Sequence, residues 1–403
     1  MLKNINFKII LFGFIFTFFS SFGQSFFLGL FNAPIRNELD ITHGQFGSIY
    51  ATATIFSSLL LIWVGKKIDD YRILNYSLFV VILLFASSLF FSFINNIYLL
   101  AIGIFLMRFS GQGLMSHTST TTISRFFERS RGKALSTIWF GLSTAEFILP
   151  VLITYFFLIY SWRTVWQGIA ILIILFLPFV ILNTIKSINL DSREADTNSK
   201  NKLKIKSWRR RDVLKDYRFY IVSLNMLAMP WIATGVFVYQ SFISDSKMWS
   251  IYTIPKAFMV YSITSIATLF VSGFLVDKFT GRKLILYMNL PLLLAMITLF
   301  NFNHEIFAYV FLGLIGVSNG LANILGSSTW AEIYGVKYIG SIKALTTAFM
   351  VFSTAFGTAV FGLLIDEGFS IENIAFVGAV YIVISLALLV IFRKTIEPVK
   401  LAN

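Results

Sequence analysis

The chain has 403 residues, of which 57% are hydrophobic and 13% are charged, with a mean hydropathy of +0.78 and a formal net charge of +14. A soluble globular protein has roughly 25% charged residues, so this composition excludes that class and indicates a membrane protein. The absence of cysteine excludes disulfides and thiolate chemistry, and the three histidines argue against a histidine metal cluster.

Twelve apolar stretches, each long enough for a membrane-spanning helix, follow one another along the chain. They lie near residues 9–31, 44–64, 73–94, 98–123, 133–158, 164–185, 218–242, 250–276, 284–300, 307–331, 341–365 and 374–392. The first is too long for a signal peptide and lacks a small-residue cleavage site, so we expect a retained helix. The sequence therefore predicts an all-α integral membrane protein with twelve transmembrane helices.

Lysine and arginine are distributed unevenly between the two sides of these helices. With a cytoplasmic N-terminus, the tails, the loops after even-numbered helices and the segment 186–218 hold 28 of the 33, and the opposite loops hold three. Because basic residues accumulate on the cytoplasmic side, we expect both termini inside, in the cytoplasmic membrane (the inner membrane of a bacterium). The net charge then serves insertion and contact with anionic lipids rather than nucleic-acid binding.

One long polar stretch, residues 186–217, divides the chain into two predicted six-helix bundles, residues 1–185 and 218–403. We expect this stretch to be a basic cytoplasmic linker; a regulatory role is the alternative. The two halves also resemble each other at fixed spacings. Gly65 and Asp69 in the first half correspond to Gly273 and Asp277 in the second. Gly113 and Arg125 correspond in the same way to Gly320 and Glu332. Two related six-helix halves are typical of transporters that work by alternating access.

The loop after the eighth helix, Gly273-x-x-x-Asp277-Lys278-Phe279-Thr280-Gly281-Arg282-Lys283, is similar to the best-known loop motif of the major facilitator superfamily. Arg108 followed by Gly111-Gln112-Gly113, Arg131-Gly132-Lys133-Ala134 and Ser161-Trp162-Arg163 also fit, so the chain resembles this family over essentially its whole length. The loop after the second helix departs from the motif at Asp70 and Arg72. Within the family the chain resembles the branch near monocarboxylate and oxalate/formate porters.

The resemblance implies a secondary transporter whose loop motifs form latches between the halves at the cytoplasmic face. The implied gating residues are Gly65, Asp69, Arg72, Gly273, Asp277, Gly281, Arg282 and Lys283. We expect Asp277 with Arg282, near Gly132, to form the stronger latch and Asp69, near Gly340, the weaker one, since a carboxylate can meet a helix N-terminus. The alternative is that these are hydrophilic loop residues only.

Two charged residues, Arg108 and Glu146, lie inside predicted helices four and five, where an unpaired ion is costly. At 1.5 Å per residue, Arg108 lies about 15 Å below the outer end of its helix and Glu146 about 18 Å above the inner end of its own. In a core about 30 Å thick these depths agree, so we expect a direct ion pair. Either Arg108 binds an anionic substrate while Glu146 carries a coupling proton, or the pair is structural.

Other polar residues in the spans are candidate cavity residues. On the fourth helix, Gln112, Met115 and Ser119 share the face of Arg108, and His117 points roughly the opposite way. The resemblance implies that helices one, four, seven and ten line the pathway, which adds Gln24, Asn225, Tyr239, Asn319 and Asn323. Interhelical hydrogen bonds are the alternative for the amides.

Two basic or titratable residues leave a choice of roles. His117 is a proton relay or a hydrogen-bonded packing residue. Lys256 attracts anions from outside or extends its amine to the interface.

The sequence thus predicts a transporter of a small organic anion, monocarboxylate-like, coupled to protons or to sodium. The alternatives are a drug efflux pump, a transporter-like sensor that binds without flux, and a membrane-embedded enzyme. An enzyme would need an acid–base or nucleophilic cluster, and no histidine lies near an acidic residue within a predicted span. No cofactor is implied, and a single chain can form a complete pathway, so we expect a monomer.

Overall fold

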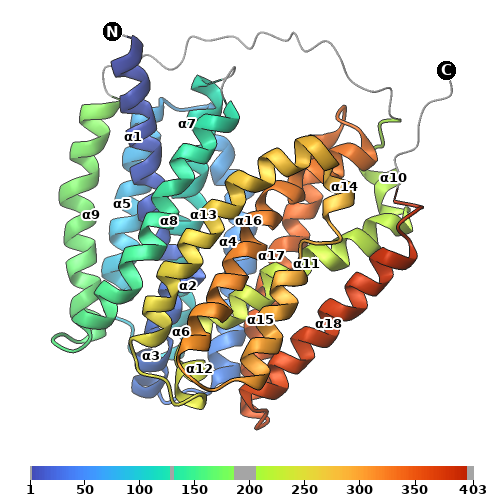
Figure 1. The fold of residues 1–403 in the computed structure, drawn as a ribbon. Coiled ribbons are helices and arrows are strands. Elements are labelled where there is room, and N and C mark those ends of the chain that lie inside the picture. Colours follow the sequence, from blue (N-terminus) through green and yellow to red (C-terminus); the bar gives the residue numbers. More distant parts are fainter. Residues whose placement is uncertain (1, 128–130, 186–205, 397–403) are drawn as a thin grey trace. The chain divides into compact units, whose positions relative to one another are not determined.

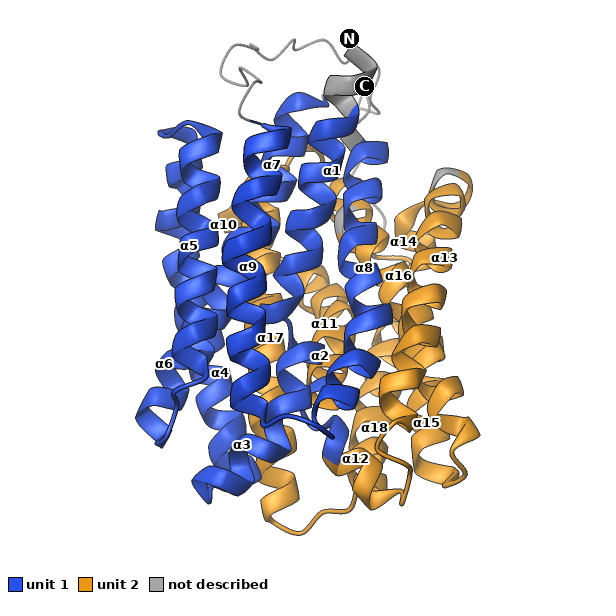
Figure 2. Ribbon diagram, turned by 90° about the vertical axis from the view of Figure 1, so that its left-hand side faces the viewer, with its two compact units in different colours: residues 1–197, 237–241 blue, residues 198–236, 242–403 orange. Residues whose placement is uncertain are grey.

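A computed structural model of the chain describes residues 2–127, 131–185 and 206–396, apart from the side chains of residues 2–6, 131, 277 and 327. The described residues form helices joined by turns and contain no strand (Figure 1). Contacts divide the chain into two compact units, residues 1–197 with 237–241 and residues 198–236 with 242–403 (Figure 2). Most of the predicted linker, residues 186–205, lies outside the described part.

Unit 1 is built from the helices of the first half. They are α1 (Leu2–Ser20), η1 (Ser21–Gly23), α2 (Ser25–Leu28), η2 (Gly29–Phe31), α3 (Asn32–Leu39), α4 (His43–Lys66), η3 (Lys67–Asp69), α5 (Ile73–Phe91), α6 (Ile97–Met107), η4 (Arg108–Met115), α7 (Ser116–Phe126), α8 (Arg131–Phe156) and α9 (Trp162–Thr184). Side chains fix several starts. Thr42 and Gln45 form a capping box at α4, and Asn96 caps α6.

Unit 2 holds most of the second half. Its elements are α10 (Arg210–Leu214), α11 (Tyr217–Val238), α12 (Gln240–Ser246), α13 (Thr253–Phe279), α14 (Gly281–Leu284), α15 (Leu290–Asn301), α16 (Ile306–Tyr334), α17 (Ile339–Asp366) and α18 (Ile371–Ile391). The end of α11 and the start of α12 contact unit 1 residues and are assigned to unit 1.

Ten described helices are long and apolar enough to cross a membrane, and the bent pair Phe7–Gly23 and Ser25–Leu39 counts as an eleventh span. The remaining predicted stretch, 284–300, is only partly a regular helix, because turns occupy residues 285–289 before α15. There the buried Asn289 turns inward and donates from Nδ2 to the carbonyl oxygen of Asn225 at 2.6 Å. The prediction of an all-α, multi-pass membrane protein is confirmed.

The first helix lies between the fourth and the fifth in unit 1. A Cβ at Gly141 of α8 would overlap the backbone of Phe14 in α1, and a Cβ at Gly23 would overlap the backbone of Met107 and Gln112. These backbones approach so closely only because glycine has no side chain. The α1–η1 segment therefore packs on α8 on one side and on η4 on the other.

Each unit has an ion pair that joins the end of its first span, or the turn directly after it, to the start of its last helix. In unit 1, Glu38 forms an ion pair with Arg163 and accepts a hydrogen bond from Trp162 Nε1 at 2.6 Å. Arg163 also donates to the Ser92 carbonyl at 2.9 Å. In unit 2, Lys247 Nζ lies 2.6 Å from Glu372 Oε1. We call these two pairs the outer clasps, because the distribution of basic residues predicts that these ends of the helices face outward.

The two outer clasps are equivalent in position but opposite in charge. Arg163 is the second residue of α9, which Ser161 caps, and Glu372 is the second residue of α18, which Ser370 caps. The basic member contacts the loop between the third and fourth helices of its unit in both cases, since Lys247 also donates to Asn303 Oδ1 at 2.7 Å. The internal repeat thus extends to the loops.

Breaking the second clasp is expected to destabilise the protein to a degree that depends on which partner is removed. The Lys247 side chain is 0% exposed and that of Glu372 is 34% exposed. Glu372→Ala leaves a buried cation without a carboxylate, so we expect a loss of roughly 3 kcal/mol. Lys247→Met leaves a carboxylate that water reaches, at a cost of about 1 kcal/mol. Thermal unfolding in detergent measures both; the reverse order would contradict this account.

Candidate functional site

The guanidinium of Arg108 is buried in unit 1 without a carboxylate partner among the described residues. The residue is 3% exposed. Its Nη1 donates to the Gly23 carbonyl at 3.2 Å and to Ser25 Oγ at 3.4 Å, and the group lies 5.2 Å from the centre of the Tyr50 ring. Its Nε is buried and has no acceptor. A cation that neither pairs with an acid nor satisfies its donors is suited to an anionic ligand.

Two breaks in helices create this environment. At Gln24 the backbone is extended, which ends η1, and the adjacent Gly23 carbonyl accepts from Arg108. Arg108 itself opens η4, a π-helical segment that interrupts the fourth helix. Gly111 and Gly113 favour this departure, and Ser110 Oγ bonds back to the Leu106 carbonyl at 2.7 Å. π-Helical segments are frequent at functional sites.

The predicted ion pair between Arg108 and Glu146 is wrong for this structure. Glu146 lies in α8 and is 7% exposed, and its carboxyl makes no ion pair or hydrogen bond with any described residue. The physical reason is the position of the first helix. The depths of the two residues are compatible, but α1 and η1 occupy the space between η4 and α8.

The close contact at Gly23 gives a direct test of this arrangement. Gly23→Ala is expected to push η1 away from η4, which costs about 1–3 kcal/mol of stability and moves the Gly23 carbonyl from Arg108. Gly168→Ala in α9 is the matched control, because a Cβ there meets nothing within 4 Å and alanine favours the helix by about 0.5–1 kcal/mol. Equal thermal stability of the two variants would contradict the close packing.

The sequence did not indicate the partners that surround Arg108. Tyr50 is 1% exposed in α4, and its hydroxyl donates to Ser25 Oγ at 3.2 Å. One feature of the sequence could have indicated them: Tyr50 and Thr54 are polar residues one turn apart in an apolar helix. Both are buried in the structure. Gly23 contributes through its carbonyl, which no side-chain pattern reveals.

The predicted cavity residues of unit 1 fall into two groups. Gln24 and Gln112 are half-buried beside the Arg108 environment, Gln24 at the break and Gln112 in η4. Tyr239, which clusters with unit 1, donates its hydroxyl to the His43 carbonyl at 2.9 Å. Ser119 donates to the Gly13 carbonyl at 2.8 Å, whereas His117 Nε2 lies 3.0 Å from the Gly65 carbonyl of α4. The pathway roles of these residues stay predictions.

In unit 2, two of the predicted amides are engaged between helices. Asn225 Nδ2 donates to Ser385 Oγ at 3.4 Å, and Asn319 Nδ2 donates to Ser265 Oγ at 2.9 Å. Asn323 is exposed in α16. Lys256 is exposed in the first turn of α13, with its amine 5.8 Å from the Tyr252 ring. Asn225 and Asn319 thus form hydrogen bonds between helices, which was the alternative to a role in the cavity. A role of these four residues in solute binding stays a prediction.

Within unit 1, the predicted gating residues after α4 contact α7, which is the last segment of the fourth predicted helix. Arg125 of α7 pairs with Asp69 and donates from Nη1 to the Ile68 carbonyl at 3.4 Å. Arg72 precedes α5 and is exposed. His117, on the same helix as Arg125, contacts Gly65. The sequence noted Arg125 only as a repeated position and did not predict its ion pair.

In unit 2, the position equivalent to Arg125 carries the opposite charge, because it is Glu332. Glu332 of α16 accepts from the backbone N–H of Gly281 at 2.7 Å and of Arg282 at 3.1 Å. Gly281 packs closely there, because a Cβ would lie 3.1 Å from the backbone nitrogen of Thr329. Lys283 is exposed and Gly273 lies in α13, while the side chain of Asp277 lies outside the described residues. The latches with Gly132 and Gly340 stay predictions.

Comparisons with known proteins identify the fold. A family model described as Major Facilitator Superfamily matches residues 13–254 and 221–403. No curated protein matches the sequence. A bacterial homolog to the human lysosomal transporter Spinster, in its inward-facing and unoccupied conformation, covers 98% of both chains at 13% identity with a TM-score of 0.75. The nucleoside transporter NupG covers 97% of this chain and 98% of its own at 15% identity with a TM-score of 0.70.

These identities show the fold and not the solute. The predicted fold class, an all-helical membrane protein with the two-domain architecture of this family, is confirmed by the family model and by both structures. The described residues supply ten of the twelve predicted spans, or eleven with the bent pair. The resemblance to the monocarboxylate branch is not part of these matches and stays a prediction.

Proposed function

Because the chain belongs to the Major Facilitator Superfamily, and so is a multi-pass membrane transporter rather than an enzyme, we propose that it carries a small organic anion together with a proton. The observation that supports this proposal is the buried Arg108, whose charge no described carboxylate balances. The transport mechanism is alternating access between the two sides of the membrane.

Arg108 supplies the anion site. A guanidinium stays protonated even when buried, so it must be neutralised by a ligand or by water when no acid is adjacent. Its Nη1 is engaged by Gly23 and Ser25, so Nε, which has no acceptor, and the adjacent Nη2 present the fork that binds a carboxylate through two parallel hydrogen bonds. The nearby Ser25 hydroxyl accepts from Tyr50 and from Arg108, so its own O–H can donate to a second oxygen of the solute. A monocarboxylate fits this set of donors.

Glu146 supplies the proton site. A buried carboxylate without a cation avoids the cost of desolvation by holding a proton. The residue has this environment in α8, on the far side of the first helix from Arg108. It therefore does not exchange places with the solute, as a direct pair would. Instead, anion binding removes the positive field of Arg108 that favours ionised Glu146, so solute binding and proton uptake reinforce each other.

Several features of the transport cycle belong to the same proposal. Protons are the coupling ion, with sodium as the alternative, and the working unit is a monomer in the bacterial inner membrane with both termini in the cytoplasm. The charge distribution supports this orientation, since 28 of 33 basic residues fall on the predicted inner side.

Uptake of radiolabelled monocarboxylates into proteoliposomes, with and without an imposed pH gradient, tests the proposal. One proton carried with each monoanion allows about tenfold accumulation per unit of pH difference. Accumulation driven by the gradient supports the proposal. Absence of flux for every monocarboxylate, with flux of an apolar cationic drug in the same vesicles, would replace it by drug efflux.

A further inference from the structure

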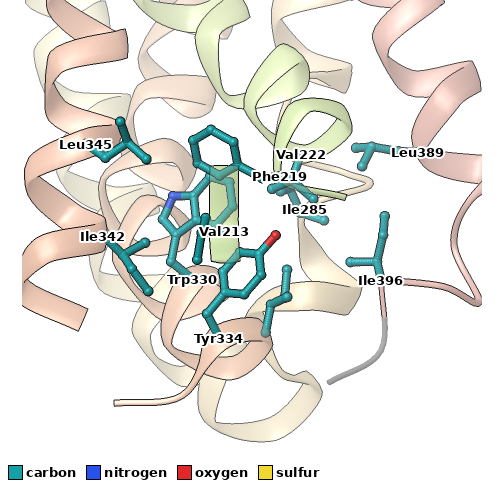
Figure 3. Packing of buried hydrophobic residues seen from close by; sticks show 11 residues of the cluster. Val213, Phe219, Val222, Ile285, Trp330, Tyr334, Ile342, Leu345, Leu389 and Ile396 are labelled. Atoms are coloured by element: carbon teal, nitrogen blue, oxygen red, sulfur yellow. The ribbon is translucent and has the colours of Figure 1, made fainter. Parts of the chain in front are cut away.

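The part of the interdomain segment that the structure describes, residues 206–216, is folded onto unit 2. The N–H of Trp208 donates to the Tyr334 carbonyl at 3.0 Å, and the two rings pack edge to face with centroids 5.6 Å apart. Val213 of α10 is fully buried in a cluster with Phe219, Trp330 and other apolar residues (Figure 3). This segment is therefore a fixed element rather than a tether.

Arg218 joins this element to the end of the chain. Its guanidinium pairs with Asp216 at 2.7 Å, lies 5.3 Å from the centre of the Trp208 ring, and donates to the Thr395 carbonyl at 3.3 Å. The adjacent Tyr217 packs on Phe392, with ring centroids 5.8 Å apart. Two segments almost 180 residues apart in the sequence thus lie side by side next to α10.

Five basic side chains project from these two segments. Arg210, Arg211, Lys215, Arg393 and Lys394 are exposed, and none of their side chains has an ion pair or hydrogen bond with a described residue. The two acids nearby are already engaged. Asp212 accepts from the N–H of Arg209, and Asp216 pairs with Arg218. We call these five residues the basic ledge.

The ledge is placed where two membrane-spanning helices end. α11 begins at Tyr217, three positions after α10 ends at Leu214, and α18 ends at Ile391, two positions before Arg393. Tyr217 and Tyr220 are 52% and 49% exposed beside it. Tyrosines concentrate at the boundary between acyl chains and headgroups, so the ledge lies at headgroup level. This is also the end of unit 2 that the charge distribution predicts to be cytoplasmic.

We propose that the basic ledge is a binding site for the headgroup of an anionic phospholipid. Its charges are preorganised, since Val213, Trp208 and Arg218 anchor the backbone that carries them. A phosphodiester held by several basic side chains and flanked by exposed tyrosine rings satisfies both the charges and the apolar surface. A soluble anion would leave the rings uncovered. The site takes no part in solute recognition, so the proposal of a lipid site can be tested independently of the proposed transport function.

Native mass spectrometry of the full chain in detergent, titrated with phosphatidylglycerol or phosphatidylcholine, tests the site. We compare the ledge variant Arg210→Gln/Arg211→Gln/Lys215→Gln with the control Lys278→Gln/Lys283→Gln/Lys343→Gln. The control removes the same charge from exposed residues of the same unit. We expect the ledge variant to bind phosphatidylglycerol at least about tenfold more weakly and the control to change less than about twofold.

Location is tested by photo-cross-linking with a phosphatidylglycerol analogue, followed by peptide mapping. Cross-links concentrated in residues 206–220 and 390–396 support the ledge. Equal loss of binding in both triple variants would show a general effect of charge and overturn the proposal. The same conclusion would follow if phosphatidylcholine bound as tightly as phosphatidylglycerol, or if inorganic phosphate displaced the lipid from the unchanged protein.

Discussion

Arg108→Gln is expected to lower monocarboxylate uptake at least about 100-fold without destabilising the protein. Truncating one member of a buried, hydrogen-bonded charge pair costs 2–5 kcal/mol of binding, and about 2.7 kcal/mol corresponds to 100-fold. Stability is preserved because Arg108 has no carboxylate that its removal would leave unpaired. Uptake into proteoliposomes and thermal unfolding are measured on the same preparations.

Two further variants make this result specific. Arg108→Lys keeps the charge but loses the planar fork, so we expect uptake between those of the unchanged protein and Arg108→Gln. Arg393→Gln removes an exposed arginine and is expected to leave solute uptake unchanged. A structural ion pair predicts something different, namely a loss of roughly 3–5 kcal/mol of stability in Arg108→Gln. That loss, together with undiminished uptake in the surviving protein, would rule out an anion site at Arg108.

Glu146→Gln is expected to separate solute movement from the pH gradient. Glutamine resembles the protonated acid in shape and polarity but cannot release a proton. Exchange of labelled for unlabelled solute should persist, while accumulation driven by a difference of one pH unit should fall from about tenfold to none. Counterflow and gradient-driven uptake in the same vesicles measure the two activities.

The thermal stability of Glu146→Gln provides the control. Since the buried Glu146 carboxyl has no ion pair, the folded protein bears the cost of protonating or desolvating it near neutral pH, and glutamine removes that cost, so the thermal stability of Glu146→Gln should be equal to or higher than that of the unchanged protein. Aspartate at this position keeps the titratable group and should retain some gradient-driven accumulation. Full accumulation in Glu146→Gln would assign the coupling proton to another residue, or the coupling to sodium.

The sequence predicted the spans well because hydropathy reports the length of an apolar helix directly. Stretches such as 73–94 and 374–392 match α5 and α18 closely at their starts. It did not predict where helices break. Ser21–Gly23 and Asn289 are short polar or glycine interruptions within apolar runs, and their effect depends on a tertiary partner: η4 for Gly23 and the Asn225 carbonyl for Asn289.

The candidate site was predicted in part, and for a similar reason. Arg108 and Glu146 are conspicuous as charges in apolar stretches, and both are buried. Their predicted contact failed because adjacency along the chain was taken as adjacency in space. The glycines at 23 and 141 let the first helix pass between the two residues, and no pattern within helices four and five alone contains that information.

The opposite charges of the outer clasps bear on how the chain assembles as it enters the membrane. The first half is synthesised before the second, and Glu38, near the end of α3, pairs with Arg163 in the same half. When the second half emerges, Glu372 would repel Glu38 and Lys247 would repel Arg163, so exchange of partners between halves is opposed at both contacts. Each group of six helices is thereby directed to close on itself, which protects a duplicated architecture from mistaken pairing between its two copies.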